Sequence, residues 1–189
     1  MIHGKNIVIR QIEIGDEEYL YRWWNDEILM EHATHAFGVL QSLDAIKIKV
    51  IKDIEDTTMF PSEKRFIICK RDSMKPIGEI NYSNWDKRNQ KCELGIKICE
   101  INDQGKGYGL DALYNFIDFM FRFLNLNKIE LTTMIDNKRA KELYRKLGFK
   151  EIGIIRDAYY DSRYGQFSDV VYMDLLRREW EVEKLNINL

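Results

Sequence analysis

The amino-acid sequence predicts an α+β fold with a mixed, mostly antiparallel sheet and flanking helices. Three observations lead to this class. Short β-branched runs separated by polar turns recur through the first hundred residues, as in antiparallel strands. A strand, a loop, a helix and a second strand then follow one another from Lys91 to Ile135, the order of a parallel crossover. A last helix and a strand pair complete the sheet.

In the first half of the chain, four strands and two helices are expected. The strands cover residues 6–11, 65–70, 77–83 and 91–99, with a polar hairpin turn at 86–90. The helices cover residues 16–30 and 42–52, the second with Ser42 as its N-cap. Alternation along the fourth strand places Leu94 and Ile96 on one face of the sheet and Glu93 and Lys97 on the other.

In the second half, the apolar spacing predicts two helices, over residues 108–124 and 137–147. Gly148 is expected to end the second helix in a left-handed conformation. Strands are expected over residues 128–135, 149–156 and 169–175. The last two are expected to be joined by an aromatic, polar loop at 157–168.

Composition excludes several classes of protein. The chain has 189 residues and a formal net charge of −2, so a broad nucleic-acid footprint is not expected. It has no apolar run long enough to span a membrane and no apolar N-terminal signal region. Cys69, Cys92 and Cys99 lie in expected strands and are interpreted as buried and reduced, which favours a cytoplasmic protein. The histidines, including His32 and His35, form no metal set with them, so no metal is expected.

The most informative motif is the glycine-rich segment Gln104-Gly-Lys-Gly-Tyr-Gly109 between a strand and a helix. Three glycines let backbone N–H groups crowd around one point, and the helix that follows directs its positive end there, which suits a phosphate or pyrophosphate. The segment is no Walker A loop, because no Ser or Thr follows a Gly-Lys pair, and its spacing fits the dinucleotide fingerprint poorly. Taken alone, it could also be a turn that only caps a helix.

A second motif decides between these interpretations. Residues 137–149 read Asn-Lys-Arg-Ala-Lys-Glu-Leu-Tyr-Arg-Lys-Leu-Gly-Phe. The two motifs, in this order and about thirty residues apart, resemble the pyrophosphate loop and the following helix of the GCN5-related N-acetyltransferase (GNAT) superfamily. The resemblance extends from Ile7 to Trp180 and is nearest to ribosomal-protein N-terminal and polyamine acetyltransferases. It implies one N-acetyltransferase domain over residues 1–189, with a splayed parallel strand pair in the sheet.

The resemblance also implies acetyl-CoA as the acetyl donor and assigns residues to it. The amides of 105–109 would hold the pyrophosphate, with Lys106 adding charge and Gln104 closing the loop. The pantetheine arm would meet the backbone around Ile98 and Cys99, where one N–H would hold the thioester oxygen. The predicted cofactor-binding residues are Ile98, Cys99, Gln104, Gly105, Lys106, Gly107, Tyr108, Gly109 and Asn137.

One catalytic residue follows from the same resemblance, and a second follows from its position on the expected strand. Tyr144 is expected to be the general acid, because a tyrosine with a pKa of about 10 can share a proton with a thiolate whose thiol has a pKa of about 8.5. Glu93, beside the expected reaction centre, is the first choice for the general base of the protonated amine. Glu79 on the preceding strand is the alternative carboxylate, and water without a carboxylate is the other possibility.

The acceptor is expected to be a primary amine. Residues 13–31 hold seven acidic residues and one base, Arg22, which suits a small cationic amine such as a polyamine. The second of Trp23 and Trp24 could line the acceptor pocket, and the aromatic loop at 157–168 could gate it or form a dimer contact. A protein N-terminus is the alternative acceptor. A catalytically idle acyl-CoA-binding module and another phosphate-binding protein are the other interpretations left open.

Overall fold

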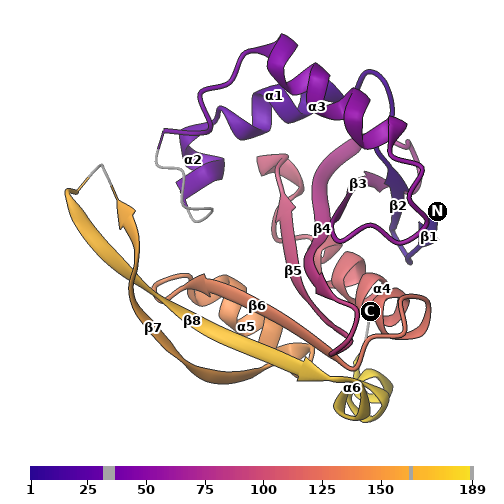
Figure 1. Ribbon diagram of the computed structural model, residues 1–189, viewed down its shortest axis with the longest axis vertical. Helices are drawn as coiled ribbons and strands as arrows, with labels where there is room; N and C mark the ends of the chain where they lie inside the picture. The colour runs from indigo at the N-terminus through magenta and orange to yellow at the C-terminus, as the bar shows by residue number, and fades with distance from the viewer. Residues whose placement is uncertain (32–36, 162–163, 188–189) are drawn as a thin grey trace.

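The computed structural model describes residues 1–31, 37–161 and 164–187; His32 and His35 lie outside these residues. The described chain folds around an eight-stranded sheet in the order β1-β2-β3-β4-β5-β6-β8-β7 (Figure 1). Strands β1 to β5 pair antiparallel with one another in this order, and β8 pairs antiparallel with both β6 and β7. The strands are β1 Ile2–His3, β2 Ile7–Gln11, β3 Lys64–Lys70, β4 Pro76–Asp86, β5 Lys91–Ile98, β6 Lys128–Met134, β7 Lys150–Asp161 and β8 Gln166–Leu176.

The parallel pair is β5 and β6, and it is short. Only residues 91–93 of β5 pair with residues 128–130 of β6. Beyond Glu93 the two strands diverge, and β5 continues alone on this side to Ile98 (Figure 1). The predicted α+β class with a splayed parallel pair is therefore confirmed.

Helices cover the two faces of the sheet unequally. The helices are α1 Asp16–Trp24, α2 Glu27–Met30, α3 Leu43–Glu55, α4 Tyr108–Arg122, α5 Lys138–Lys146 and α6 Arg177–Glu183. One core contains side chains of α4, α5 and α6 packed on one face, with Phe116, Tyr144 and Trp180 among its buried members. A smaller core packs α1 and α3 on the opposite face, against Ile67 and Cys69 of β3. In the described structure, no helix covers β6 and β8 on that second face (Figure 1).

Two expectations for the secondary structure were wrong, and one helix was missed. The helix over 16–30 is broken, because Asp26 accepts hydrogen bonds from the N–H groups of Ile28 and Leu29 and begins α2. The loop at 157–168 is largely strand, since Tyr160 pairs with Phe167 and extends the hairpin, as the β-propensity of aromatic residues favours. Helix α6 was not predicted. The expected caps at Ser42 and Gly148 are confirmed, and Asn137 caps the start of α5.

A buried ion pair fixes the start of α1 on the sheet. Both terminal nitrogens of Arg10 in β2 donate to the Asp16 carboxylate at 2.7 Å. Asp16 also accepts the backbone N–H of Glu13 at 2.8 Å. The carboxylate raises the pKa of Arg10, although burial opposes this. Because both side chains are buried, neither charge can be left without its partner at low cost.

We expect Asp16→Asn to lower the free energy of unfolding by about 3 kcal/mol, because it leaves the Arg10 cation buried opposite a neutral amide. Urea denaturation followed by circular dichroism measures the change. Glu18→Gln on the same helix is the matched control, since Glu18 is exposed, and should change the free energy by less than about 0.5 kcal/mol. Equal effects of the two substitutions would contradict the role given to this ion pair.

Candidate active site

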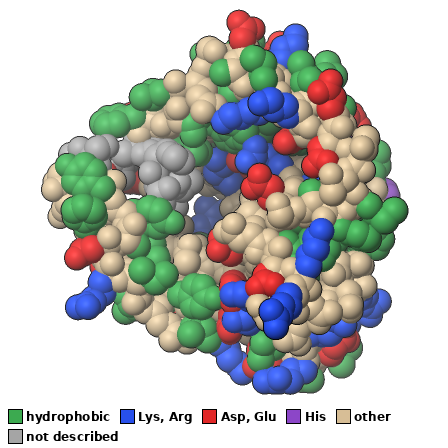
Figure 2. Space-filling model, in the orientation of Figure 1, with side chains coloured by type: hydrophobic (Ala, Val, Ile, Leu, Met, Phe, Trp, Pro, Cys, Tyr) green, Lys and Arg blue, Asp and Glu red, His purple; other side chains and the backbone are tan. Residues whose placement is uncertain are grey.

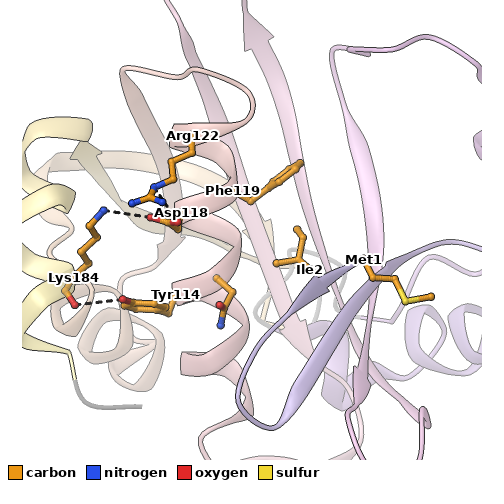
Figure 3. Close-up of a pocket in the computed structure, with 8 residues that line it drawn as sticks. Met1, Ile2, Tyr114, Asp118, Phe119, Arg122 and Lys184 are labelled. Atoms are coloured by element: carbon orange, nitrogen blue, oxygen red, sulfur yellow. Dashed lines mark hydrogen bonds and ion pairs between the residues drawn. The ribbon is translucent and has the colours of Figure 1, made fainter.

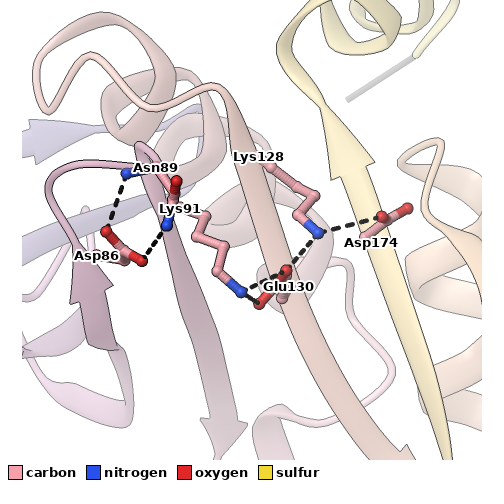
Figure 4. A network of polar contacts seen from close by, with 6 residues as sticks. All are labelled: Asp86, Asn89, Lys91, Lys128, Glu130 and Asp174. Atoms are coloured by element: carbon pink, nitrogen blue, oxygen red, sulfur yellow. Dashed lines mark hydrogen bonds and ion pairs between the residues drawn. The ribbon is translucent and has the colours of Figure 1, made fainter.

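The closed end of the gap between β5 and β6 is held by a charged network (Figure 4). Lys91 of β5 lies 3.2 Å from the Glu130 carboxylate of β6, and Lys128 pairs with the same carboxylate. Lys128 also lies 3.8 Å from Asp174 of β8. Burial disfavours the charged form of Glu130, but hydrogen bonds from Lys128, Tyr172 and Lys91 outweigh it and lower the pKa. The network ties three strands together at the point from which the gap opens.

Every second residue at the end of β5 directs its backbone N–H group into the gap. The N–H of Cys99 donates to the carbonyl oxygen of Ile77 in β4 at 2.8 Å. Since successive strand residues direct their N–H groups to opposite sides, those of Ile98 and Ile96 point into the gap. Of the predicted pair, Ile98 can therefore meet a ligand through its amide, and the Cys99 amide is already bonded. The Cys99 side chain is buried in the smaller core.

The glycine-rich loop lies at the open end of the gap. Gly105 and Gly107 adopt φ values of +77° and +85°, which favour glycine. Apart from the adjoining residues of the loop, no atom of the described chain lies within 4 Å of where a Cβ at either glycine would project, so the loop faces open space. Helix α4 begins at Tyr108 without a side-chain cap, which leaves N–H groups of its first turn directed at that space. Lys106 is exposed beside it. These residues fit the pyrophosphate of acetyl-CoA.

Gln104 joins this loop to the strand and to α5. Its Nε2 donates to the carbonyl oxygen of Ile98 at 2.9 Å, while its Oε1 accepts from Arg139 at 3.2 Å. A Cβ on Gly109 would lie 3.7 Å from both Ile98 and Leu143, so the start of α4 fits closely between β5 and α5. The structure thus brings Ile98, Gln104 and the glycines together. Arg139, which the sequence analysis missed, reaches the loop because it lies in the first turn of α5.

Two further predicted residues lie on or before α5. The Asn137 side chain accepts the N–H of Ala140 at 3.0 Å and caps the helix. Tyr144 points into the larger core, where its ring meets the edge of Phe149 at 5.7 Å between centroids. Among the described residues, none forms a hydrogen bond with the Tyr144 hydroxyl. Burial raises the pKa of Tyr144 to about 12, so the hydroxyl stays protonated and can donate.

The face of β4 and β5 that points away from the larger core is polar, and it lines a hollow in the molecular surface (Figure 2). Glu79 accepts from Trp24 Nε1 at 3.0 Å and lies 3.2 Å from Arg65 and 3.3 Å from Lys97. Three donors around one buried carboxylate indicate a structural role. This role disfavours Glu79 as the base.

Glu93 differs from Glu79 in its surroundings. It lies at the closed end of the gap, opposite Ser83 and beside Glu130, and it is exposed. Asn81, which the sequence analysis missed, lies between the two acids and over Gly95, where a Cβ would come within 2.6 Å of its side-chain oxygen. Asn81 lies opposite Gly95 in the strand register, which the local sequence does not show.

Residues 13–31, whose acids and tryptophans were expected to bind the acceptor, are only partly free to do so. Trp23 and Trp24 are both buried, so neither ring lines an open pocket; their Nε1 groups donate to Glu100 and Glu79. Three acids of residues 13–31 are also used locally. Asp16 pairs with Arg10, Asp26 caps α2, and Glu17 accepts the N–H of Gly15.

A separate groove of about 380 Å³ lies on the α4 side of the molecule (Figure 3). Ile2 of β1 and Tyr114 and Phe119 of α4 are among its lining residues. Its polar groups pair with one another, since Asp118 lies 3.2 Å from Arg122 and 3.5 Å from Lys184. It contains none of the residues predicted for acetyl-CoA or catalysis.

Comparison with known proteins identifies the class of this site. The sequence profile of the acetyltransferase (GNAT) domain matches residues 6–150. The chain therefore belongs to the GNAT family and is an N-acetyltransferase with acetyl-CoA as its donor. No helix in the described part of the chain is long and apolar enough to cross a membrane.

Particular relatives are similar along most or half of the chain. The uncharacterized N-acetyltransferase p20 of Bacillus licheniformis is 28% identical over 95% of this chain and 97% of its own length. The structure of spermidine N-acetyltransferase from Vibrio cholerae with CoA and spermine has a TM-score of 0.82 at 25% identity, covering 93% of this chain and 98% of that one. The Escherichia coli (strain K12) [ribosomal protein uS5]-alanine N-acetyltransferase is 34% identical over 58% of this chain and 55% of its own length.

The buried tyrosines predict how the protein responds to alkali. Burial raises the pKa of Tyr82 and of Tyr144 from the ordinary 10.0 to about 12. The folded state therefore resists their ionisation. The contribution of these two tyrosines to the free energy of unfolding is fully present below pH 10 and is lost as the pH rises towards 12. In a pH titration, we expect exposed tyrosines to form phenolate first and these two only with loss of the circular dichroism signal. Phenolate formation at every tyrosine near pH 10 with the fold intact would contradict this.

Proposed function

We propose that this chain transfers the acetyl group of acetyl-CoA directly to a primary amine, most simply a polyamine, across the gap between β5 and β6. The observation that carries the proposal is the divergence of these strands after three residue pairs, with the glycine-rich loop at the open end. The gap exposes N–H groups of β5 between a pyrophosphate seat and the exposed Glu93 carboxylate.

Acetyl-CoA supplies an activated thioester carbonyl, and the chain binds it in two places. The amides of 105–109 and Lys106 hold the pyrophosphate, and the Ile98 amide meets the arm that enters the gap. The N–H of Ile96 lies one pleat deeper, about 7 Å further along the strand, and is the donor for the thioester oxygen. The N–H that binds the thioester oxygen is therefore that of Ile96 and not that of Ile98, two residues nearer to Glu93.

The proton transfers are assigned to opposite faces of the sheet. Glu93, on the polar face, takes a proton from the acceptor amine, directly or through water. Tyr144, in the core on the other face, donates a hydrogen bond to the departing sulfur. Its pKa of about 12 exceeds that of a thiol, so donation of a hydrogen bond is favoured over complete proton transfer.

A polyamine acceptor is supported by the relatives and by charge. Spermidine N(1)-acetyltransferase of Vibrio cholerae is similar over 94% of this chain. The Glu93 carboxylate forms no ion pair with the described residues, so it is available to attract the protonated amine of a cationic acceptor, while Lys97 is already paired with Glu79. A protein N-terminus is the second candidate, favoured by the partial likeness to the uS5-alanine acetyltransferase.

Substitution of Tyr144 by Phe should lower kcat by about 10- to 100-fold, because it removes a hydrogen bond used only as the thiolate leaves. The affinity for acetyl-CoA, measured by isothermal titration calorimetry, should stay within about twofold. Tyr114→Phe is the matched control, since Tyr114 lies in the groove behind α4. Loss of acetyl-CoA binding in Tyr144→Phe would show that Tyr144 is structural.

Thiol release from acetyl-CoA, measured with a panel of amines, tests the acceptor class. We expect release with spermidine and spermine and little with peptides that begin with Ala or Ser. Glu93→Gln should lower kcat/KM for spermidine about tenfold, while the exposed Glu142→Gln on α5 should not change it. Release with the peptides alone would overturn the polyamine assignment in favour of the protein N-terminus.

A further inference from the structure

The outer part of the β7–β8 hairpin exposes apolar side chains on both of its faces. Ile152, Ile154 and Ile155 of β7 are 56%, 56% and 48% exposed. Tyr160 and Phe167, which pair across the two strands, are 57% and 60% exposed. Figure 2 shows hydrophobic side chains along the left edge of the molecule, where Figure 1 places this hairpin. A patch of this kind marks an interaction surface.

Strand β7 is also an edge of the sheet. It pairs with β8 on one side, and no described strand pairs with its other side. Natural edge strands are usually shielded by charges or bulges. Here the pairing with β8 is irregular between Glu151 and Gly153 and between Ile155 and Tyr159, so only a short stretch retains a regular ladder. Contact with this edge must therefore rest mainly on side chains.

The charges along β7 are complementary between two copies of the strand that lie antiparallel to each other. Residues 150–157 read Lys-Glu-Ile-Gly-Ile-Ile-Arg-Asp: a base and an acid, four uncharged residues, then a base and an acid. Read backwards, every charge faces its opposite, and the isoleucines meet at the centre. An antiparallel second copy would place Glu151 near Arg156 of the other chain and Lys150 near its Asp157. Such a two-fold contact is isologous.

The existing ion pairs leave half of this pattern free. Glu151 pairs with Arg145, and Lys150 pairs with Glu179 at 2.5 Å, all within one chain. Among the described residues, none forms an ion pair with Arg156 or Asp157. A second copy would supply partners for these two side chains and would cover the isoleucines between them.

We infer that β7 docks antiparallel against β7 of a second copy of this chain, forming a homodimer centred on Ile154. The contact combines burial of the exposed isoleucines with two symmetric sets of opposite charges. It does not depend on the proposed acetyl acceptor, because it uses residues outside the gap and the glycine-rich loop.

Light scattering after size-exclusion chromatography, across a concentration series of the full chain, tests the inference. We expect the wild type to be a dimer and Arg156→Glu and Glu151→Arg each to weaken association at least about tenfold, since each sets like charges against one another. A mixture of the two variants should form heterodimers, because the two acidic side chains of one variant then face the two basic side chains of the other.

Controls separate this contact from misfolding. Arg88→Glu in the β4–β5 turn makes the same charge change elsewhere and should leave the dimer intact, and circular dichroism should be unchanged in every variant. Ile154→Asp should dissociate the dimer as well. A monomeric wild type, or a dimer that survives both Arg156→Glu and Ile154→Asp, would overturn the inference.

Discussion

Backbone pairing between β5 and β6 stops after three residues, and the rest of the site depends on this. Buried strand N–H groups normally have partners, so a gap inside a sheet is costly unless a ligand fills it. The charged network of Lys91, Lys128 and Glu130 holds the strands together at one end. At the other end, Gln104 donates to Ile98 of β5 and accepts from Arg139 of α5, the helix that follows β6. The gap is thus fixed at both ends before a ligand enters.

The sheet also divides the chemistry between two environments. Tyr144 lies on the face packed by α4, α5 and α6, where burial keeps its hydroxyl protonated by raising its pKa. Glu93 lies on the face that no described helix covers at β6 and β8, open to solvent and to an acceptor. Acetyl-CoA in the gap would therefore have the protonated Tyr144 hydroxyl on its apolar side and the Glu93 carboxylate on its polar side. The proposed roles of the two residues follow from this difference in burial.

Much of this arrangement could be predicted from the sequence. The glycine-rich loop, the crossover and the second motif act through local spacing, so the positive φ of Gly105 and Gly107 and the position of Asn137 at the start of α5 agree with the local sequence. Properties that depend on register or tertiary packing could not be read locally. The pairing of Asn81 with Gly95, the use of the Cys99 amide by Ile77 and the burial of both Trp23 and Trp24 depend on neighbouring strands and helices. The break at Asp26 depends on a cap that outweighed helical periodicity.

Amide hydrogen exchange with and without acetyl-CoA, resolved at single residues by NMR, tests the central claim most directly. The account predicts new protection at the amides of Ile96 and Ile98 and through the loop at 105–109. It predicts no added protection at Cys99, whose N–H is already bonded to Ile77. Protection confined to the groove behind α4, or unchanged exchange along β5, would contradict binding of the donor in the gap.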